Sequence, residues 1–190
     1  MHRTQQWLIA IVCLFLPTVA AAVSLEQMDV SVQDGTVRAT MIAHLQAEPA
    51  QVRSALTSFE RLEQLNPSIQ SSEVVARQGE SMRVRTKVRQ CLGIFCREMT
   101  RTEAVRVGKH TIRARMVPDA SDFRSGRTLW LITASDGGTR LEVRIQLTPE
   151  DPPPGLLDGA LAENMREQLR DTLDRLEGME TIPTQAQAGG

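Results

Sequence analysis

Cys91 and Cys96 have the most informative spacing among the reactive side chains of this sequence. They enclose residues 92–95, three of which are bulky and apolar, in the stretch CLGIFC. In an oxidising compartment such a pair forms a disulfide, whereas a redox-active pair has the C-x-x-C spacing. A structural zinc ion needs about four ligands, and beyond residue 22 only His44 and His110 could add to the cysteines. We therefore predict a Cys91–Cys96 disulfide that closes a small loop, with no metal site and no cofactor.

Acid–base catalysis in this chain would depend on isolated side chains. The sequence has no tyrosine and no G-x-S-x-G, H-E-x-x-H, phosphate-loop or dinucleotide-binding motif. The acid–base candidates are His44, Glu98, Glu103, His110, Asp119 and Asp122. Neither histidine has an evident catalytic partner, and carboxylates of an arginine-rich sheet are typically solvated. We predict no catalytic residue and expect a protein that is not an enzyme; a cyclase or dehydratase using a strand carboxylate or histidine is the alternative hypothesis.

The N-terminal segment has the pattern of a secretory signal. A basic start is followed by an apolar run from Trp7 to Leu16, then by small residues up to Ala22. The run is too short for a membrane-spanning helix, which needs about 20 apolar residues. We predict a signal peptide over residues 1–22 and export, most simply to a periplasm. The mature domain would cover residues 23–180, and the small, polar residues 181–190 would form a disordered tail.

Hydrophobic periodicity indicates which elements position these side chains. Apolar residues alternate over residues 36–47, which predicts a strand. An Asp-Gly pair before it allows a short additional hairpin. Two short helices follow before Pro67, and an amphipathic helix is expected over residues 156–178. Further strands are expected near residues 70–78, 81–91, 96–107, 110–117, 126–134 and 139–148. Strands grouped apart from helices indicate an α+β domain with an antiparallel sheet.

This order of elements, the segment SFERLEQLNPSI and the closing long helix resemble the START-like superfamily, also called SRPBCC or polyketide cyclase/dehydrase and lipid transport. The resemblance covers residues 36–178 and is nearest to the coenzyme Q-binding START branch. It implies a helix-grip fold, in which a curved seven-stranded antiparallel sheet surrounds a long C-terminal helix. It also implies an apolar cavity between the sheet and the helix, and a hydrophobic small molecule or lipid as ligand.

The expected cavity residues are the apolar side chains that alternation and helical spacing place on the inner faces. They are Met41, Met82, Val84, Val88, Met116, Leu131 and Val143 on strands, and Leu157, Leu161 and Met165 on the helix. Small residues and flexible methionines nearby would leave room for an apolar ligand. The alternative is a filled core, which would favour a protein-interaction module of the cell envelope.

Alternate connections of an antiparallel meander lie at the same end of the sheet, which locates the mouth of this cavity. Residues 91–96, 118–126 and 149–157 would meet there, together with the NPSI segment. The predicted mouth residues are Leu92, Ile94, Phe95 and Phe123. An apolar tip flanked by arginine suits either a gate with transient contact to a membrane surface or a lid folded on the core. The sequence leaves both open.

Basic residues are concentrated in the predicted sheet. Residues 81–147 contain fourteen Lys and Arg against six Asp and Glu, and residues 148–181 contain three Arg against nine acids. Arg83, Arg85, Lys87 and Arg89 alternate on one strand face. Such a face is either a solvated outer surface or a surface for anionic lipid headgroups or an acidic partner. Export and the aromatic content of 3% argue against nucleic acid as a partner.

Overall fold

The structure, a computed structural model, describes residues 23–93 and 95–178, except for the side chain of Phe95. The predicted signal peptide and C-terminal tail lie outside the described residues. The strands are β1 (Ser24–Gln33), β2 (Thr36–Leu45), β3 (Ile69–Gln78), β4 (Ser81–Leu92), β5 (Phe95–Val107), β6 (Thr111–Met116), β7 (Phe123–Ser135) and β8 (Gly138–Pro149). The helices are α1 (Pro49–Thr57) and α2 (Asp158–Gly178), with 3-10 turns η1 (Leu62–Gln64), η2 (Pro118–Ala120) and η3 (Gly155–Leu157).

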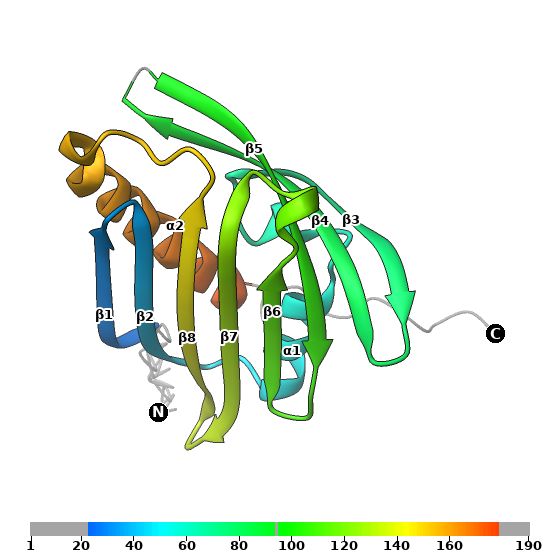
Figure 1. Ribbon diagram of the computed structural model, residues 1–190. Coiled ribbons are helices and arrows are strands. Elements are labelled where there is room, and N and C mark those ends of the chain that lie inside the picture. The colour runs from blue at the N-terminus through cyan, green and yellow to red at the C-terminus, as the bar shows by residue number, and fades with distance from the viewer. Residues whose placement is uncertain (1–22, 94, 179–190) are drawn as a thin grey trace, which may run out of the picture.

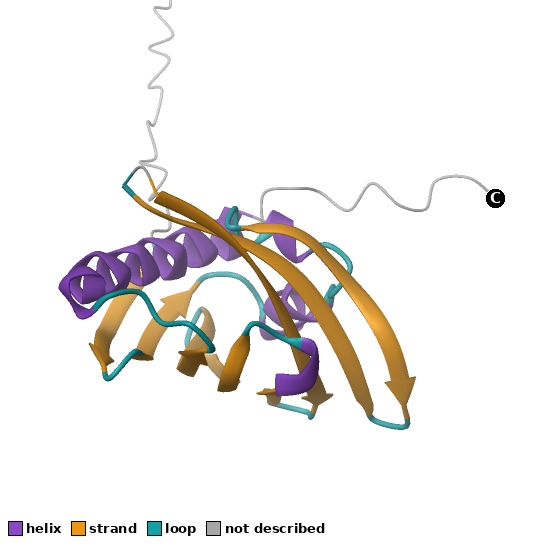
Figure 2. Ribbon diagram, turned by 45° about the horizontal axis from the view of Figure 1, so that its top comes forward, coloured by secondary structure: helices purple, strands orange, loops and turns teal. Residues whose placement is uncertain are grey.

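All eight strands form one antiparallel sheet in the order β1-β2-β8-β7-β6-β5-β4-β3 (Figure 1). The sheet curves, and α2 lies across its concave side (Figure 2). Alternation explains this arrangement, since the buried residues Ala39, Met41 and Ala43 of β2 share one face. The leucines of the apolar stripe of α2, such as Leu169 and Leu173, pack into the same core. The predicted α+β helix-grip architecture is confirmed.

The structure differs from the expected seven strands by one additional edge strand. β1 pairs with β2 through a turn in which Asp34 and Gly35 both have positive φ, at 50° and 69°. An Asp-Gly pair is a preferred sequence for such a two-residue hairpin turn. Of the two short helices, α1 is present and the second is the single turn η1. A hydrogen bond from the Ser68 backbone N–H to Asn66 Oδ1 forms a polar turn immediately after η1, around Pro67.

No helix in the described part of the chain is both long and apolar enough to cross a membrane.

Candidate ligand-binding cleft

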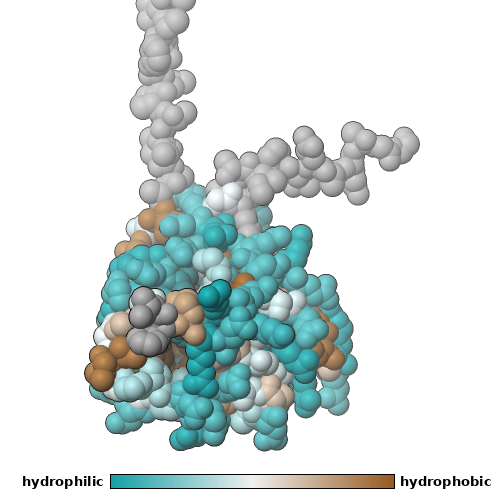
Figure 3. All heavy atoms as spheres, turned by 90° about the horizontal axis from the view of Figure 1, so that it is seen from above, coloured by the Kyte–Doolittle hydropathy of each residue, from teal (hydrophilic) through white to brown (hydrophobic). Residues whose placement is uncertain are grey.

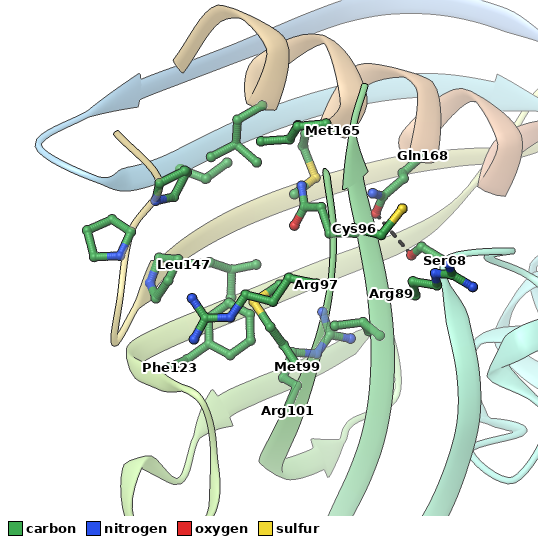
Figure 4. Close-up of a pocket in the computed structure, with 18 of the residues that line it drawn as sticks. Ser68, Arg89, Cys96, Arg97, Met99, Arg101, Phe123, Leu147, Met165 and Gln168 are labelled. Atoms are coloured by element: carbon green, nitrogen blue, oxygen red, sulfur yellow. Dashed lines mark hydrogen bonds between the residues drawn. The ribbon is translucent and has the colours of Figure 1, made fainter. Parts of the chain in front are cut away.

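A cavity of about 370 Å³ lies between the inner face of the sheet and the first turns of α2. It opens at the end of the sheet where the β4–β5 hairpin, the start of β7 and the 149–154 connection meet (Figure 4). Its apolar walls include Val88, Met99 and Phe123 from the sheet, and Leu161 and Met165 from α2. We call this the outer cavity. The three connections that were predicted to lie at one end of the sheet, residues 91–96, 118–126 and 149–157, therefore do meet there.

A second cavity of about 140 Å³, the inner cavity, continues toward α1. The two cavities adjoin because Asn66, Ile69, Arg101, Leu147, Met165 and Gln168 line both. Leu56, Phe59 and Trp130 form part of the deeper wall. The sheet and α2 thus enclose two adjoining cavities, which together we call the cleft, so a completely filled core does not describe this protein.

Arg101 and Glu103 place an ion pair inside this mostly apolar cleft. They are two residues apart on β5, so both side chains point to the inner face, in step with Met99 and Val105. Arg101 Nε lies 3.1 Å from Glu103 Oε2, and the side chains are 24% and 9% exposed. The other carboxylate oxygen, Glu103 Oε1, is buried and has no hydrogen-bond partner among the described residues. A buried acceptor without a donor is costly, so this oxygen is free to accept from a bound molecule.

A row of amides and a hydroxyl forms the polar side of the cleft. Gln168 Nε2 and Gln90 Nε2 both donate to Asn164 Oδ1, at 2.5 and 3.2 Å. The Ser68 hydroxyl lies 2.6 Å from Asn66 Oδ1 and 3.3 Å from Gln168 Oε1 (Figure 4). These bonds connect α2 to β4 and to the start of β3 across the cleft. These hydrogen bonds join the amides and the hydroxyl into an uncharged polar part of the wall.

The Cys91–Cys96 disulfide is present and joins directly opposed residues near the end of the β4–β5 hairpin, with a Cα–Cα distance of 4.0 Å. The predicted disulfide is thus confirmed. Arg97, one residue further along β5, forms an ion pair with Asp151 at 3.2 Å and so connects the hairpin to the 149–154 connection. Both Cys96 and Arg97 line the outer cavity. The disulfide-linked β4–β5 hairpin therefore forms one side of the mouth of the outer cavity.

The predicted mouth residues occupy different environments. Phe123 is buried and packs with Met99, Met116 and Leu147, so it forms a wall of the outer cavity. Leu92 is half-buried and also lines the outer cavity. Ile94 lies outside the described residues, and so does the side chain of Phe95. Leu156, which follows the 149–154 connection, is 85% exposed at this end of the molecule. Figure 3 shows this end, with brown apolar atoms beside a mostly teal surface.

Several predicted cavity residues do line the cleft. Val88, Leu157, Leu161 and Met165 contact the outer cavity, and Val84 contacts the inner cavity.

Other predicted cavity residues lie elsewhere. Met41 and Val143 are fully buried in the packed core, and Met116 packs under Phe123. Met82 borders a separate shallow pocket beside the end of α1.

The expectation that Leu131 faces the helix is wrong. Leu131 pairs with Thr111 and Glu142, whereas its neighbours Trp130 and Ile132 belong to the inner face. Because alternate residues of a strand point to opposite faces, Leu131 lies on the outer face.

Most of the acid–base candidates lie away from the cleft. His44 Nε2 lies 3.3 Å from Glu26 Oε2 on the outer face, and His110 is exposed in the β5–β6 turn. Asp122 accepts a hydrogen bond from the Thr100 backbone N–H, which orders the β6–β7 connection. Glu98 and Asp119 are exposed. Of these candidates in the described part of the chain, Glu103 is the one that lines the outer or the inner cavity.

Sequence reasoning named Glu103 as an acid–base candidate but did not place it in the cleft, and it missed Arg101, Gln90 and Gln168. Arg101 and Glu103 share the parity of Met99 and Val105 on β5, so strand alternation already indicated that they point inward. The amides of Gln90 and Gln168 gave no comparable signal. Within the described residues, no group of three or more His, Cys, Asp or Glu could hold a metal ion.

The chain is similar to known proteins in sequence pattern and in fold. A family model described as polyketide cyclase / dehydrase and lipid transport matches residues 36–178. No curated protein matches the sequence.

Three solved structures illustrate the similarity of fold. The protein TTHA0849 from Thermus thermophilus is 24% identical with a TM-score of 0.61, and the match covers 75% of this chain and 94% of that one. A STAR-related lipid transfer protein from Xanthomonas axonopodis is 13% identical with a TM-score of 0.58, covering 78% and 98%. The Zhui aromatase/cyclase from a Streptomyces species is 15% identical with a TM-score of 0.62, covering 86% and 100%. Identities this low establish the shared fold alone.

Proposed function

The chain belongs to the polyketide cyclase / dehydrase and lipid transport family, and we propose that it binds and carries a hydrophobic small molecule or lipid in the cleft between the sheet and α2. The cleft formed by the adjoining outer and inner cavities is the observation that carries this proposal. Ligand pockets typically have volumes of about 300–1,000 Å³ and mostly apolar walls. Transfer of apolar ligand surface from water to such walls provides the free energy of binding.

The ion pair on β5 indicates what kind of hydrophobic molecule fits. Arg101 lines both cavities and carries N–H donors, while Glu103 Oε1 is a buried acceptor that lacks a donor among the described residues. A ligand hydroxyl can donate to Glu103 and accept from Arg101. The proposed ligand is therefore an amphiphile whose apolar part fills the cleft and whose hydroxyl, or a similar donor–acceptor group, lies at the junction of the cavities.

Mass spectrometry of the protein purified from the cells that make it tests this proposal. Native spectra and organic extracts are expected to contain an apolar compound in near-stoichiometric amount. Met165 lines both cavities, so Met165→Trp is expected to fill the cleft and abolish co-purification of the compound. Leu156→Trp is the matched control because this exposed residue lies outside the lining. Recovery of no apolar compound from the unaltered protein, or equal recovery from both variants, would contradict ligand carriage.

Glu103 also supports a second candidate function, a cyclase or dehydratase. Such an enzyme needs a proton donor or acceptor that faces the substrate, and Glu103 provides a carboxylate inside the cleft. The two functions differ in the fate of the bound compound. Incubation of the extracted compound with ligand-free protein would return it unchanged in mass and in chromatographic retention if the protein is a carrier. Loss of one water per molecule that depends on Glu103 would establish a dehydratase instead.

We also infer that the protein is exported, most simply to a periplasm. The pattern of residues 1–22 and the Cys91–Cys96 disulfide support this inference. Cell fractionation combined with alkylation under non-reducing conditions should find the protein outside the cytoplasm, with both cysteines protected. Full-length protein with free thiols in the cytoplasm would contradict export.

A further inference from the structure

Exposed arginines cover the outer face of the sheet, opposite α2. We call this surface the basic face; Figure 1 looks onto it, with α2 behind the sheet. Strand alternation places there a set of exposed side chains from β2, β4, β5, β6 and β7: Arg38, Arg83, Arg106, Arg113, Arg115 and Arg127. In the part of the chain that the structure describes, none of these six forms an ion pair.

The pairing register sets like charges directly against each other on this face. Arg106 of β5 is opposite Arg113 of β6, and Arg115 of β6 is opposite Arg127 of β7. Like charges in directly opposed positions destabilise a sheet. Nearby carboxylates do not compensate, because Glu142 pairs with Arg140 and Arg144 at the β8 side. Long arginine stems do cover a sheet, but that role leaves the repulsion between opposed arginines in place, whereas a bound anionic partner would neutralise it.

The basic face is continuous with the mouth of the cleft. On β4 the outward side chains run from Arg83 through Arg85 and Lys87 to Arg89, all exposed, and Arg89 also lines the outer cavity. The outer cavity, the inner cavity and the pocket beside α1 are lined mainly by residues on the other side of the sheet. A broad basic surface that ends at the opening of an apolar cleft matches a charged sheet of lipid headgroups better than a folded protein.

We propose that the basic face docks this protein on an anionic lipid surface and so brings the mouth of the cleft to the headgroups. Docking does not depend on the proposed ligand carriage, because the arginines that would bind the lipid lie on the outer face of the sheet and the cleft lies on its inner face. It adds to that function a route by which an apolar ligand passes between bilayer and cleft.

Vesicle co-sedimentation tests the proposal with protein purified from the cells that make it. Vesicles of phosphatidylglycerol and phosphatidylcholine are compared with vesicles of phosphatidylcholine alone. Binding is expected only to the anionic vesicles and should weaken as salt rises, because the headgroup attraction is screened. Removing two basic residues from such a surface weakens binding by about thirtyfold. Arg113→Glu with Arg115→Glu is therefore expected to weaken it by at least that factor.

The matched control is Arg61→Glu with Arg170→Glu, which makes the same change in net charge at exposed positions on the other side of the sheet, beside α1 and on α2. All variants keep the same N-terminus, so any contribution of that segment to vesicle binding is the same in each.

Arg113→Gln with Arg115→Gln, checked by thermal unfolding, separates loss of charge from loss of fold. Met165→Trp should bind vesicles normally, which distinguishes docking from ligand carriage. Equal binding to neutral vesicles, equal losses in both charge-reversal variants, or salt-sensitive binding to polyglutamate without vesicle binding would overturn lipid docking.

Discussion

Glu103 is the residue on which the polar chemistry of the cleft depends. We expect Glu103→Gln to weaken binding of a hydroxyl-bearing ligand by about tenfold to a hundredfold, the cost of losing a hydrogen bond to a charged group. The same change leaves Arg101 without its partner, although the Arg101 side chain is 24% exposed and partly solvated. The free energy of unfolding should therefore fall by about 1–3 kcal/mol. Urea unfolding and competition with the extracted ligand measure the two effects.

Glu98→Gln is the control for that change, because Glu98 is exposed on the opposite face of the same strand. It should alter neither ligand binding nor stability appreciably. If Glu98→Gln and Glu103→Gln weaken binding equally, the effect comes from overall charge and not from the cleft.

Arg115 illustrates a residue whose proposed role opposes stability. Arg115→Thr removes a like-charge pair with Arg127 and introduces a residue that favours strands. We expect the free energy of unfolding to rise by about 0.2–1 kcal/mol while binding to anionic vesicles falls. Arg85→Thr is the control, since it removes the Arg85–Glu73 ion pair and should bring no gain. Equal stability changes in the two variants would show that the opposed arginines carry no strain.

At the scale of elements, the disulfide acts on the β4–β5 hairpin more than on the whole fold. It closes a loop of about six residues, for which chain entropy gives roughly 2 kcal/mol of stabilisation. Cys91→Ser with Cys96→Ser should therefore speed amide exchange in residues 89–97 and shorten the residence time of a bound ligand. The β7–β8 turn provides the internal reference and should exchange as before. Faster exchange throughout the sheet would mean that the staple stabilises the entire domain.

Gly138 in the β7–β8 turn packs closely against the backbone of Leu45 and Gln46, where β2 leads into the connection to α1. A Cβ atom on Gly138 would lie 2.0 Å from the Leu45 carbonyl oxygen, and backbone there cannot move aside easily. Gly138→Ala should consequently cost about 3 kcal/mol or more in unfolding free energy. Gly79→Ala, at another turn with positive φ but open space around it, should cost only about 1 kcal/mol. Urea unfolding of both variants checks the difference.

Sequence periodicity predicted these elements well where one strand face was clearly polar. In β2 and β4 the alternation is regular, and the structure places their apolar residues on the inner face. The prediction failed in β7, because Leu129 and Leu131 on one face and Trp130 and Ile132 on the other make both faces of the strand apolar. Only the pairing with β6 and β8 decides which set faces α2. The volume of the cleft was not predictable for a related reason, because it depends on the separation of α2 from the sheet.

The whole molecule is electrically asymmetric, since a basic sheet packs against an acidic helix. Residues 81–147 carry fourteen Lys and Arg against six acids, whereas residues 148–181 carry three against nine. The exposed side of α2 includes Glu163, Glu167, Asp171 and Asp174. Near an anionic surface this distribution favours one orientation, with the sheet toward the lipid and the helix toward water.

This orientation gives a prediction for the bound protein as a whole. A fluorophore attached through Thr133→Cys, at an exposed position on the outer face of β7, should become shielded from iodide when anionic vesicles are added. A fluorophore attached through Asp171→Cys on α2 should remain fully accessible, because the sheet would lie between the helix and the lipid. Cys91 and Cys96 are in the disulfide, and Cys13 lies in the proposed signal peptide, so labelling of the exported protein stays specific. Equal shielding at the two sites would mean random orientation, and shielding of the helix alone would reverse the docked face. Shielding at Thr133 without shielding at Asp171 is expected because the distribution of charge between sheet and helix, and not the net charge of the chain, determines how the protein meets a membrane.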